Sequence, residues 1–114
     1  QRDRVRTASE FAKTYQAVVV LKGHATVVAS YDGARYVNDT GNPGMASGGC
    51  GDVLTGMIVG LLGQGLSLFD AACLGVYLHG LAGDLAAKER GEIGLLASDL
   101  LEKIPYAIRQ YQQR

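Results

Sequence analysis

The chain has 114 residues, 47% of them hydrophobic and 19% charged, so we expect one globular domain at most. Eleven basic residues balance eleven acidic ones, and no basic stripe interleaved with aromatic residues occurs, which argues against a nucleic-acid partner. The longest apolar stretch, residues 53–66, contains four glycines and is too short to span a bilayer. The two cysteines fit neither a CxxC pair nor a disulfide framework, so we expect a cytoplasmic protein without a membrane partner.

The first part of the chain predicts a helix, a strand and a hairpin. Apolar residues recur every three or four positions over residues 3–15, which predicts an amphipathic helix. The run from 17 to 21, Ala-Val-Val-Val-Leu, predicts a strand buried on both faces, as in a parallel sheet covered by helices. Two more strands are expected over 25–30 and 34–38, and the Asp32-Gly33 pair between them is typical of a tight hairpin turn.

The second half of the chain predicts three helices. Residues 49–63 have apolar positions at helical spacing, and Gly56 and Gly60 are expected to form a flat strip that packs on another element. Ser67, with an aspartate three residues later, forms a capping-box pattern at the start of a helix over 68–88. This second helix is apolar on most sides, so it should be largely buried.

Four residues of the helical half are of separate interest. His79 is read as a core histidine with a hydrogen-bond partner, and Asp84 as a capping or locally paired carboxylate. Ser98 is expected to cap the last helix, which Pro105 should break or restart. A buried strand and three helices need more sheet than this chain supplies, so we expect it to be part of a longer α/β domain.

A glycine-rich stretch, Gly41 to Asp52, contains five glycines and a proline in twelve residues, so it is a loop. The helix that follows begins near Gly49, which turns its free N–H groups and the positive end of its dipole toward this loop. An anion can approach such a turn closely, and Asp52 offers a carboxylate that accepts a proton, as phosphoryl transfer requires. The alternative is an ordinary glycine turn with a capping aspartate, and the spacing alone leaves both open.

Lys22 follows the apolar strand directly, at its carboxyl end, where ligands bind in open α/β sheets. It is a candidate phosphate or nucleotide contact, and its alternative is a solvated lysine at a strand end. The P-loop pattern is absent, and the Gly49-x-Gly51 pattern lacks the third glycine of the dinucleotide fingerprint.

Two longer motifs carry a family resemblance. Residues 42–56, Asn-Pro-Gly-Met-Ala-Ser-Gly-Gly-Cys-Gly-Asp-Val-Leu-Thr-Gly, and residues 75–84, Gly-Val-Tyr-Leu-His-Gly-Leu-Ala-Gly-Asp, resemble the ADP/ATP-dependent NAD(P)H-hydrate dehydratases of the ribokinase-like superfamily. Val-Leu-Lys-Gly at 20–23, followed by Thr-Val-Val at 26–28, fits the same family. The likeness covers nearly the whole chain, but the family domain is more than twice as long. The resemblance therefore implies that residues 1–114 form the C-terminal portion of one three-layer α/β/α sandwich, whose N-terminal half is absent.

The resemblance also implies a reaction. The substrate would be NADHX or NADPHX, the hydrated and inactive form of the reduced nicotinamide cofactor. ADP or ATP, with Mg²⁺, would phosphorylate the added hydroxyl, and elimination of phosphate would restore NAD(P)H. A homo-oligomer, and contact with the missing N-terminal half, are the expected protein partners. No residue of this chain is assigned as a metal ligand.

Carried over by position, the resemblance implies roles for nine residues. The nucleotide-binding ones would be Lys22, Gly23, His24, Ala25, Thr26 and Gly51. The backbone of Gly49, Cys50 and Gly51 would form the anion hole, and Asp52 would contact the substrate hydroxyl and act as the base. The family usually has threonine at position 50, and a thiol at a helix N-terminus is expected to have a lowered pKa and to oxidise easily.

Three alternatives stay open. A ribokinase-like kinase of a sugar or vitamin alcohol would share Asp52 and the anion hole, but would leave the phosphate on its product. A different class of enzyme would use Cys50 as a nucleophile, with His24 or His79 nearby. A non-catalytic nucleotide-binding fragment is the third.

Overall fold

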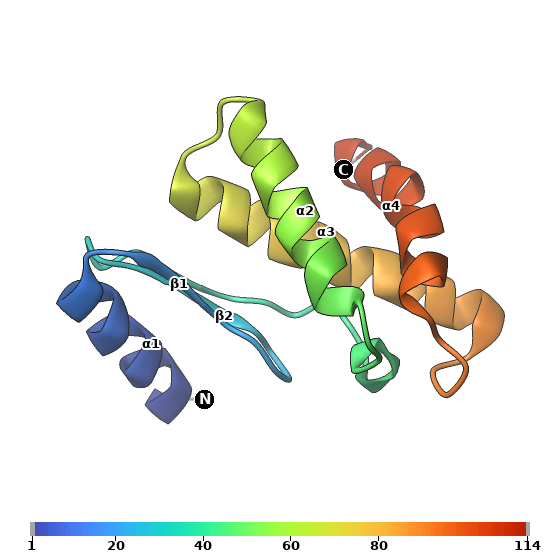
Figure 1. The fold of residues 1–114 in the computed structure, drawn as a ribbon, viewed down its shortest axis with the longest axis horizontal. Coiled ribbons are helices and arrows are strands. Elements are labelled where there is room, and N and C mark those ends of the chain that lie inside the picture. The colour runs from blue at the N-terminus through green and yellow to red at the C-terminus, as the bar shows by residue number, and fades with distance from the viewer. Residues whose placement is uncertain (1, 114) are drawn as a thin grey trace.

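The computed structural model describes residues 2–113 (Figure 1). Its elements are, in chain order, α1 (Arg2–Tyr15), β1 (Val18–Leu21), β2 (Val27–Ser30), β3 (Arg35–Val37), the short 3₁₀ helix η1 (Pro43–Met45), α2 (Cys50–Gly63), α3 (Leu68–Arg90) and α4 (Ala97–Gln112). Within these residues, no helix is both long and apolar enough to cross a membrane.

The elements form an α/β arrangement in layers around a three-stranded sheet of order β1-β2-β3. Helix α1 packs on one face of the sheet, and α3 packs on the other face together with side chains of α2. Helix α4 packs outside the sheet on α3, at the end of the molecule opposite α1 (Figure 1). The sheet is small for so much helix, which fits part of a larger sandwich.

The position of β1 between two helical layers explains why its sequence is apolar at every position. Val19 faces the cluster built on Ala8 and Ala12 of α1, whereas Val18 and Val20 face the α2 and α3 side. Both faces are covered, as the sequence predicted. The prediction of parallel pairing and full burial is wrong for the described part of the chain, because β1 pairs antiparallel with β2 and is only half-buried. Its other edge has no partner among residues 2–113, which leaves the strand partly open.

The hairpin between β2 and β3 is confirmed. Gly33 has a φ of +99° and donates its N–H to the Ser30 carbonyl at 3.1 Å. The Asp32 carboxylate accepts the N–H of Ala34 at 3.1 Å, which fixes the turn from its own side chain. Strand β2 is buried at all four positions because it lies between the other two strands and between helices.

The helix starts agree with the sequence at α3 and differ at α4. The Ser67 hydroxyl accepts the N–H of Asp70 at 3.2 Å, as predicted. At α4 the expected cap at Ser98 is wrong, because the N-cap is Leu96, whose N–H donates to the Asp99 carboxylate at 3.0 Å, so the helix starts two residues earlier. Pro105 does not break α4, which runs through it.

Close packing of α2 on α3 depends on a different glycine from those predicted. Gly56 and Gly60 are exposed, and a Cβ added at either would meet no other atom within 4 Å, so their predicted packing role is wrong here. Gly75 of α3 takes that role, since a Cβ there would lie 2.7 Å from the side chain of Ile58. Helical periodicity gives a stripe of small residues but not the direction in which it faces.

Candidate active site

The glycine-rich loop is attached to the C-terminal half of α3 through Asp84. This carboxylate accepts the backbone N–H of Gly41 at 3.0 Å and the side-chain amide of Asn42 at 2.9 Å. The other atom of that amide, Oδ1 of Asn42, accepts the N–H of Gly44 at 3.0 Å and caps η1. Asp84 therefore has the local pairing role expected for it, and both of its oxygens hold the loop in shape.

Two glycines of α3 let the loop lie directly on that helix. A Cβ on Gly80 would overlap the Thr40 hydroxyl, and a Cβ on Gly83 would overlap the Met45 sulfur. The Thr40 hydroxyl donates to the Tyr77 carbonyl at 2.9 Å, which secures the start of the loop. The motif Gly-Leu-Ala-Gly-Asp on α3 is thus a docking face for the loop that leads to α2.

The N-terminus of α2 has no side-chain cap, in contrast to α3 and α4. Its N-cap is Gly49, whose φ of +90° favours glycine. Within residues 2–113, the N–H groups of Gly51 and Asp52 donate to no acceptor. Asp52 itself is exposed in the first turn, and no donor of the described chain engages its carboxylate. This helix end presents free N–H groups and one carboxylate to its surroundings.

Lys22 is brought to this helix end from the end of β1. A Cβ built on Gly51 would lie 2.8 Å from Nζ of Lys22, so the ammonium rests against the first turn of α2. No hydrogen bond or ion pair to that ammonium occurs among residues 2–113. A cation at the positive end of a helix dipole has an unfavourable electrostatic energy. An anion bound between the two would make the interaction energy of the site favourable.

His79 of α3 contacts the same end of α2 from the core. It is 8% exposed, and its Nε2 lies 2.8 Å from the carbonyl oxygen of Cys50, so Nε2 donates this bond. Burial lowers the pKa of His79 from its ordinary value of 6.5; the Cys50 carbonyl raises it, and the charge of Lys22 lowers it further. The ring is a core histidine with a satisfied partner, as predicted, and it fixes the first residue of α2.

Cys50 points into the core and not toward the anion-binding face. The residue is 3% exposed and belongs to a cluster with Leu78, Ala82 and Leu100. Its sulfur lies 3.5 Å from the Ser47 hydroxyl. Oxidation requires access, so the expectation of ready oxidation is wrong for the folded chain. Burial also argues against Cys50 as a nucleophile. In addition, His79 contacts the carbonyl of Cys50 and not its thiol.

The segment from Lys22 to Thr26 forms the turn between β1 and β2. Lys22, Gly23 and His24, with Arg4 of α1, line an open hollow of about 490 Å³. The Thr26 hydroxyl donates to the Gly23 carbonyl at 3.2 Å and closes the turn. Arg4 was not predicted as a site residue, because nothing in the sequence of an amphipathic helix indicates that one of its arginines contacts a turn twenty residues away.

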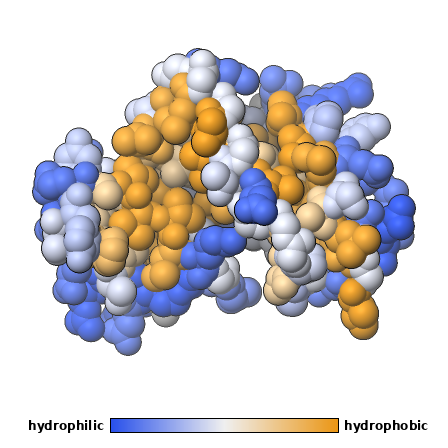
Figure 2. Space-filling model, viewed as in Figure 1, coloured by the Kyte–Doolittle hydropathy of each residue, from blue (hydrophilic) through white to orange (hydrophobic). Residues whose placement is uncertain are grey.

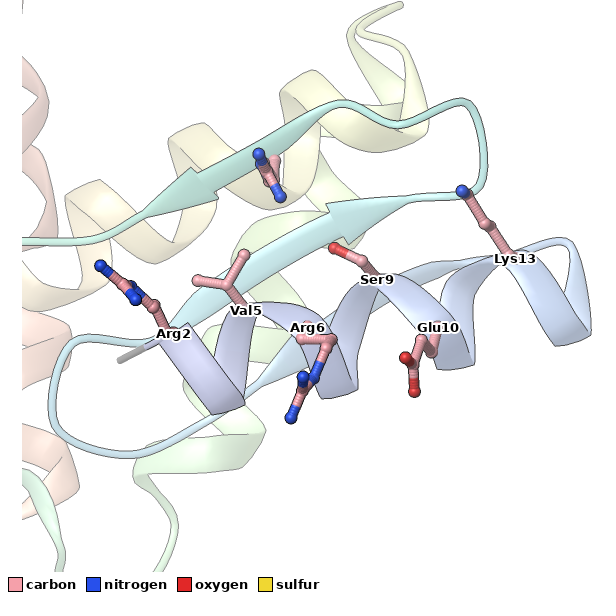
Figure 3. Close-up of a pocket in the computed structure, with 7 residues that line it drawn as sticks. Arg2, Val5, Arg6, Ser9, Glu10 and Lys13 are labelled. Carbon is pink, nitrogen blue, oxygen red and sulfur yellow. The ribbon is translucent and has the colours of Figure 1, made fainter.

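A second, larger hollow of about 570 Å³ lies along α1, beside Arg35 of β3 (Figure 3). It is lined by Arg2, Val5, Arg6, Ser9, Glu10, Lys13 and Arg35. None of the predicted site residues belongs to it. The side chains that Figure 3 labels are spread along the helix and do not converge on one point, so size alone is not a guide to the active site here.

Relatives of this chain carry one consistent description. A family model described as NAD(P)H-hydrate dehydratase matches residues 1–106. The bifunctional NAD(P)H-hydrate repair enzyme Nnr of Moorella thermoacetica is 54% identical over 113 residues, which are 99% of this chain and 21% of that protein. The ADP-dependent (S)-NAD(P)H-hydrate dehydratase of Neisseria meningitidis is 48% identical over 101 residues, which are 88% of this chain and 34% of that protein.

Solved structures agree with these relatives. The ADP/ATP-dependent NAD(P)H-hydrate dehydratase of Bacillus subtilis, co-crystallised with ATP and Mg²⁺, superposes with a TM-score of 0.91 at 40% identity. The match covers 97% of this chain and 40% of that one. A ribokinase-like superfamily protein of Enterococcus faecalis has a TM-score of 0.82 at 33% identity, over 94% of this chain and 37% of its own. The chain thus spans between a fifth and two fifths of these relatives, and its fold is part of the ribokinase-like sandwich. This chain belongs to the NAD(P)H-hydrate dehydratase family.

Proposed function

We propose that the protein containing this chain uses ADP or ATP to dehydrate NADHX or NADPHX to the reduced nicotinamide cofactor. One observation carries the proposal: the Lys22 ammonium and the uncapped N-terminus of α2 meet at Gly51, beside the Asp52 carboxylate, and neither charged group has a partner among residues 2–113. An anion-binding point next to a proton acceptor suits transfer of a phosphoryl group to a hydroxyl.

In this proposal the nucleotide phosphates lie between the two positive elements. Lys22 supplies a full charge, and the backbone N–H groups at the start of α2, from Gly49 through Gly51, supply hydrogen bonds to the transferred phosphoryl group. Of these, the N–H of Gly51 has no acceptor within residues 2–113, whereas that of Cys50 donates to the Ser47 carbonyl at 3.5 Å. The β1–β2 turn, which also contains Gly23, His24, Ala25 and Thr26, continues the nucleotide site away from α2. Position 50 contributes only its backbone, so its cysteine replaces the usual threonine without changing the hydrogen bonds.

Asp52 is proposed as the base. It takes the proton from the substrate hydroxyl while the hydroxyl oxygen bonds to the terminal phosphorus of the nucleotide and the bond to the departing nucleotide breaks. With ADP the departing nucleotide is AMP. The C–O bond of the phosphorylated intermediate then breaks with loss of a ring proton, which releases phosphate and restores the double bond of NAD(P)H. Phosphate is a much weaker base than hydroxide and therefore a better leaving group, which is the reason for the first step.

Mg²⁺ is proposed to accompany the nucleotide. Among residues 2–113, no three histidine, cysteine or carboxylate side chains are grouped as a metal site. Mg²⁺ commonly binds substrate phosphates and water with one or two carboxylates, and Asp52 is the acidic residue in the first turn of α2. When bound there, the ion would neutralise phosphate charge, and residues of this chain would hold the nucleotide that carries it.

Further protein is proposed to cover the exposed side of this chain. Figure 2 shows apolar residues gathered over the region of β1 and α2, and Val59 of α2 is 60% exposed. Gly56 and Gly60 flank Val59 and would allow close approach. The rest of a sandwich domain, of which this chain matches about two fifths in the B. subtilis structure, is our first candidate for this surface. A second copy in a homo-oligomer is the alternative.

A kinase that leaves its phosphate on a sugar or vitamin alcohol is the second candidate function. It is favoured by the match to the ribokinase-like protein of E. faecalis, and the site geometry described above serves both reactions equally. The two differ in the product: a kinase keeps the phosphate on its substrate, whereas a dehydratase releases it.

The test uses the parent protein that contains this chain. NADHX or NADPHX is mixed with Mg²⁺ and either ADP or ATP, and the absorbance of the reduced nicotinamide is followed together with free phosphate. A nucleotide-dependent rise of both in equal amounts is the expected result, and the faster nucleotide identifies the donor. Folded protein that binds nucleotide but releases neither product would reject the dehydratase and favour the kinase.

A further inference from the structure

Arg4, in the first turns of α1, reaches the turn between β1 and β2 and binds its backbone. Its Nη1 donates to the carbonyl oxygens of His24 at 2.5 Å and Ala25 at 3.0 Å. Its Nη2 donates to those of Leu21 and Lys22, both at 3.1 Å. One guanidinium thus holds four of the five carbonyls from residue 21 to residue 25.

These bonds decide where the N–H groups of the turn point. A peptide unit is planar and trans, so its N–H points opposite to its carbonyl. Since the carbonyls of Leu21, Lys22, His24 and Ala25 point to Arg4, the N–H groups of the residues after them point away from it. Within residues 2–113, no N–H of positions 22–25 donates to a carbonyl or a side chain. A set of free N–H groups on one side of a turn is a site for an anion.

The turn also has backbone angles that need support. Gly23 has a φ of +142°, and a Cβ there would lie 3.1 Å from Nη2 of Arg4. Ala25 has a φ of +56°, in the left-handed region that residues other than glycine rarely adopt. Carbonyls held by a charged donor offset the cost of such angles, because hydrogen bonds to an ionised group are stronger than neutral ones.

We propose that Arg4 is a positioning residue for the nucleotide. It holds the Lys22–Thr26 turn in one conformation, in which the free N–H groups of the turn and the Lys22 side chain point toward the nucleotide phosphates. The proposal rests on the proposed function for the identity of the ligand as ADP or ATP. Arg4 itself lies behind the turn and does not take part in proton or phosphoryl transfer.

The geometry distinguishes arginine from lysine at this position. A guanidinium is planar and has five N–H donors in a fixed fork, whereas an ammonium has three donors on a single atom. Two nitrogens of Arg4 serve two carbonyls each, which one lysine nitrogen does not reproduce. Arg4→Lys therefore keeps the charge and loses the arrangement, so it separates positioning from simple electrostatics.

The experiment compares the wild-type parent protein with its Arg4→Ala and Arg4→Lys variants. Arg6→Ala is the matched control, because Arg6 is on the same helix and, among the residues that the structure describes, its ion pair is with the exposed Asp3, at 3.3 Å. ADP affinity is measured by titration calorimetry, and kcat and KM by release of NADH. We expect both Arg4 variants to weaken ADP binding by about tenfold or more, with kcat at saturating ADP within about threefold of wild type. Arg6→Ala should match wild type in all three values.

Added guanidinium ion gives a second readout. It should restore part of the ADP affinity of Arg4→Ala, by occupying the space left by the side chain, and should not improve wild type. A residue of merely structural importance would lower the melting temperature and leave the ADP affinity of the folded fraction unchanged, and that result would overturn the proposal. If Arg4→Ala does not fold, Arg4→Lys decides: ADP affinity equal to wild type would overturn the proposal as well.

The two proposals fail in different ways. Wild-type protein that binds ADP but forms no NADH from NADHX would remove the dehydratase activity. The loss of ADP affinity in the Arg4 variants would still support the positioning role. Full activity of the wild type, together with unchanged ADP affinity in folded Arg4→Lys, would support the dehydratase activity and overturn the positioning role of Arg4.

Discussion

The ammonium of Lys22 lies against the backbone of Gly51, at the point where a Cβ on that glycine would be 2.8 Å from Nζ. The two residues are far apart in the chain, at the end of β1 and in the first turn of α2. Their contact puts a full positive charge beside the positive end of a helix dipole. Such an arrangement is stabilised when an anion binds between the two, and nucleotide phosphate is the anion that we propose for this position.

Gly51→Ala should weaken nucleotide binding by displacing Lys22. The new methyl group would have to push the ammonium away from the helix end, and loss of about 1.4 kcal/mol of binding free energy raises the dissociation constant about tenfold. Gly63→Ala is the control, because Gly63 lies at the opposite end of α2 and a Cβ there meets no atom within 4 Å. That variant should bind nucleotide normally, and it should be no less stable than wild type, since alanine favours helix over glycine. Equal nucleotide affinity in the two variants would argue against a role for the Lys22–Gly51 contact.

Asp52→Asn should abolish most turnover and retain nucleotide binding. Removal of a general base commonly costs about 10²- to 10⁴-fold in rate, and the amide keeps the size of the side chain. Asp70→Asn is the matched control, because Asp70 is also an exposed aspartate in the first turn of a helix. Steady-state release of NADH and calorimetric binding of ADP measure the two effects separately. Turnover of Asp52→Asn at the wild-type rate would exclude this residue as the base.

His79 should make the free energy of unfolding depend on pH. Burial lowers its pKa below 6.5, so under mildly acidic conditions the unfolded chain binds a proton that the folded chain does not. The stabilisation is therefore fully present above pH 6.5 and decreases as the pH falls from 6.5 toward the lower pKa of the folded state. Urea unfolding of the parent protein between about pH 5 and 8 should show this decrease, and His79→Gln should reduce it. His24→Gln, at an exposed position, should leave it unchanged.

The two cysteines should react slowly with thiol reagents in the folded protein. Cys50 is buried, and burial, followed by the charge of Asp70, raises the pKa of Cys73 to about 11. At about pH 8 a thiol with that pKa is on the order of one part in a thousand thiolate, the reactive form. Modification by a maleimide should be slow before and rapid after addition of denaturant. Rapid labelling of Cys50 in folded protein, together with loss of activity in Cys50→Ser, would instead restore the interpretation of Cys50 as a nucleophile.

Local patterns were sufficient for most of the elements. Periodicity predicted α1, α2 and α3 within a few residues, and Asp32-Gly33 predicted the hairpin, because turns and amphipathic faces depend on neighbours in the chain. The α4 start was wrong by two residues because the N-cap is Leu96, and Asp99 and not Ser98 supplies the side chain that accepts a hydrogen bond there, a choice between adjacent polar residues that geometry decides. The direction of β1 relative to β2 could not be predicted from the sequence. An apolar run indicates that both faces of a strand are covered, but it does not indicate whether the neighbouring strand is parallel or antiparallel.

The sequence by itself determined the family resemblance, the glycine-rich loop and its helix, and the candidates Lys22 and Asp52, because these depend on residue type and local spacing. Only the tertiary structure decided that Lys22 meets Gly51, that His79 binds the Cys50 carbonyl, and that Cys50 is turned into the core. It also revealed Arg4 as the residue behind the β1–β2 turn. Each of these contacts joins elements distant in sequence, and their positions follow from how the helices pack on the sheet, which no local pattern encodes.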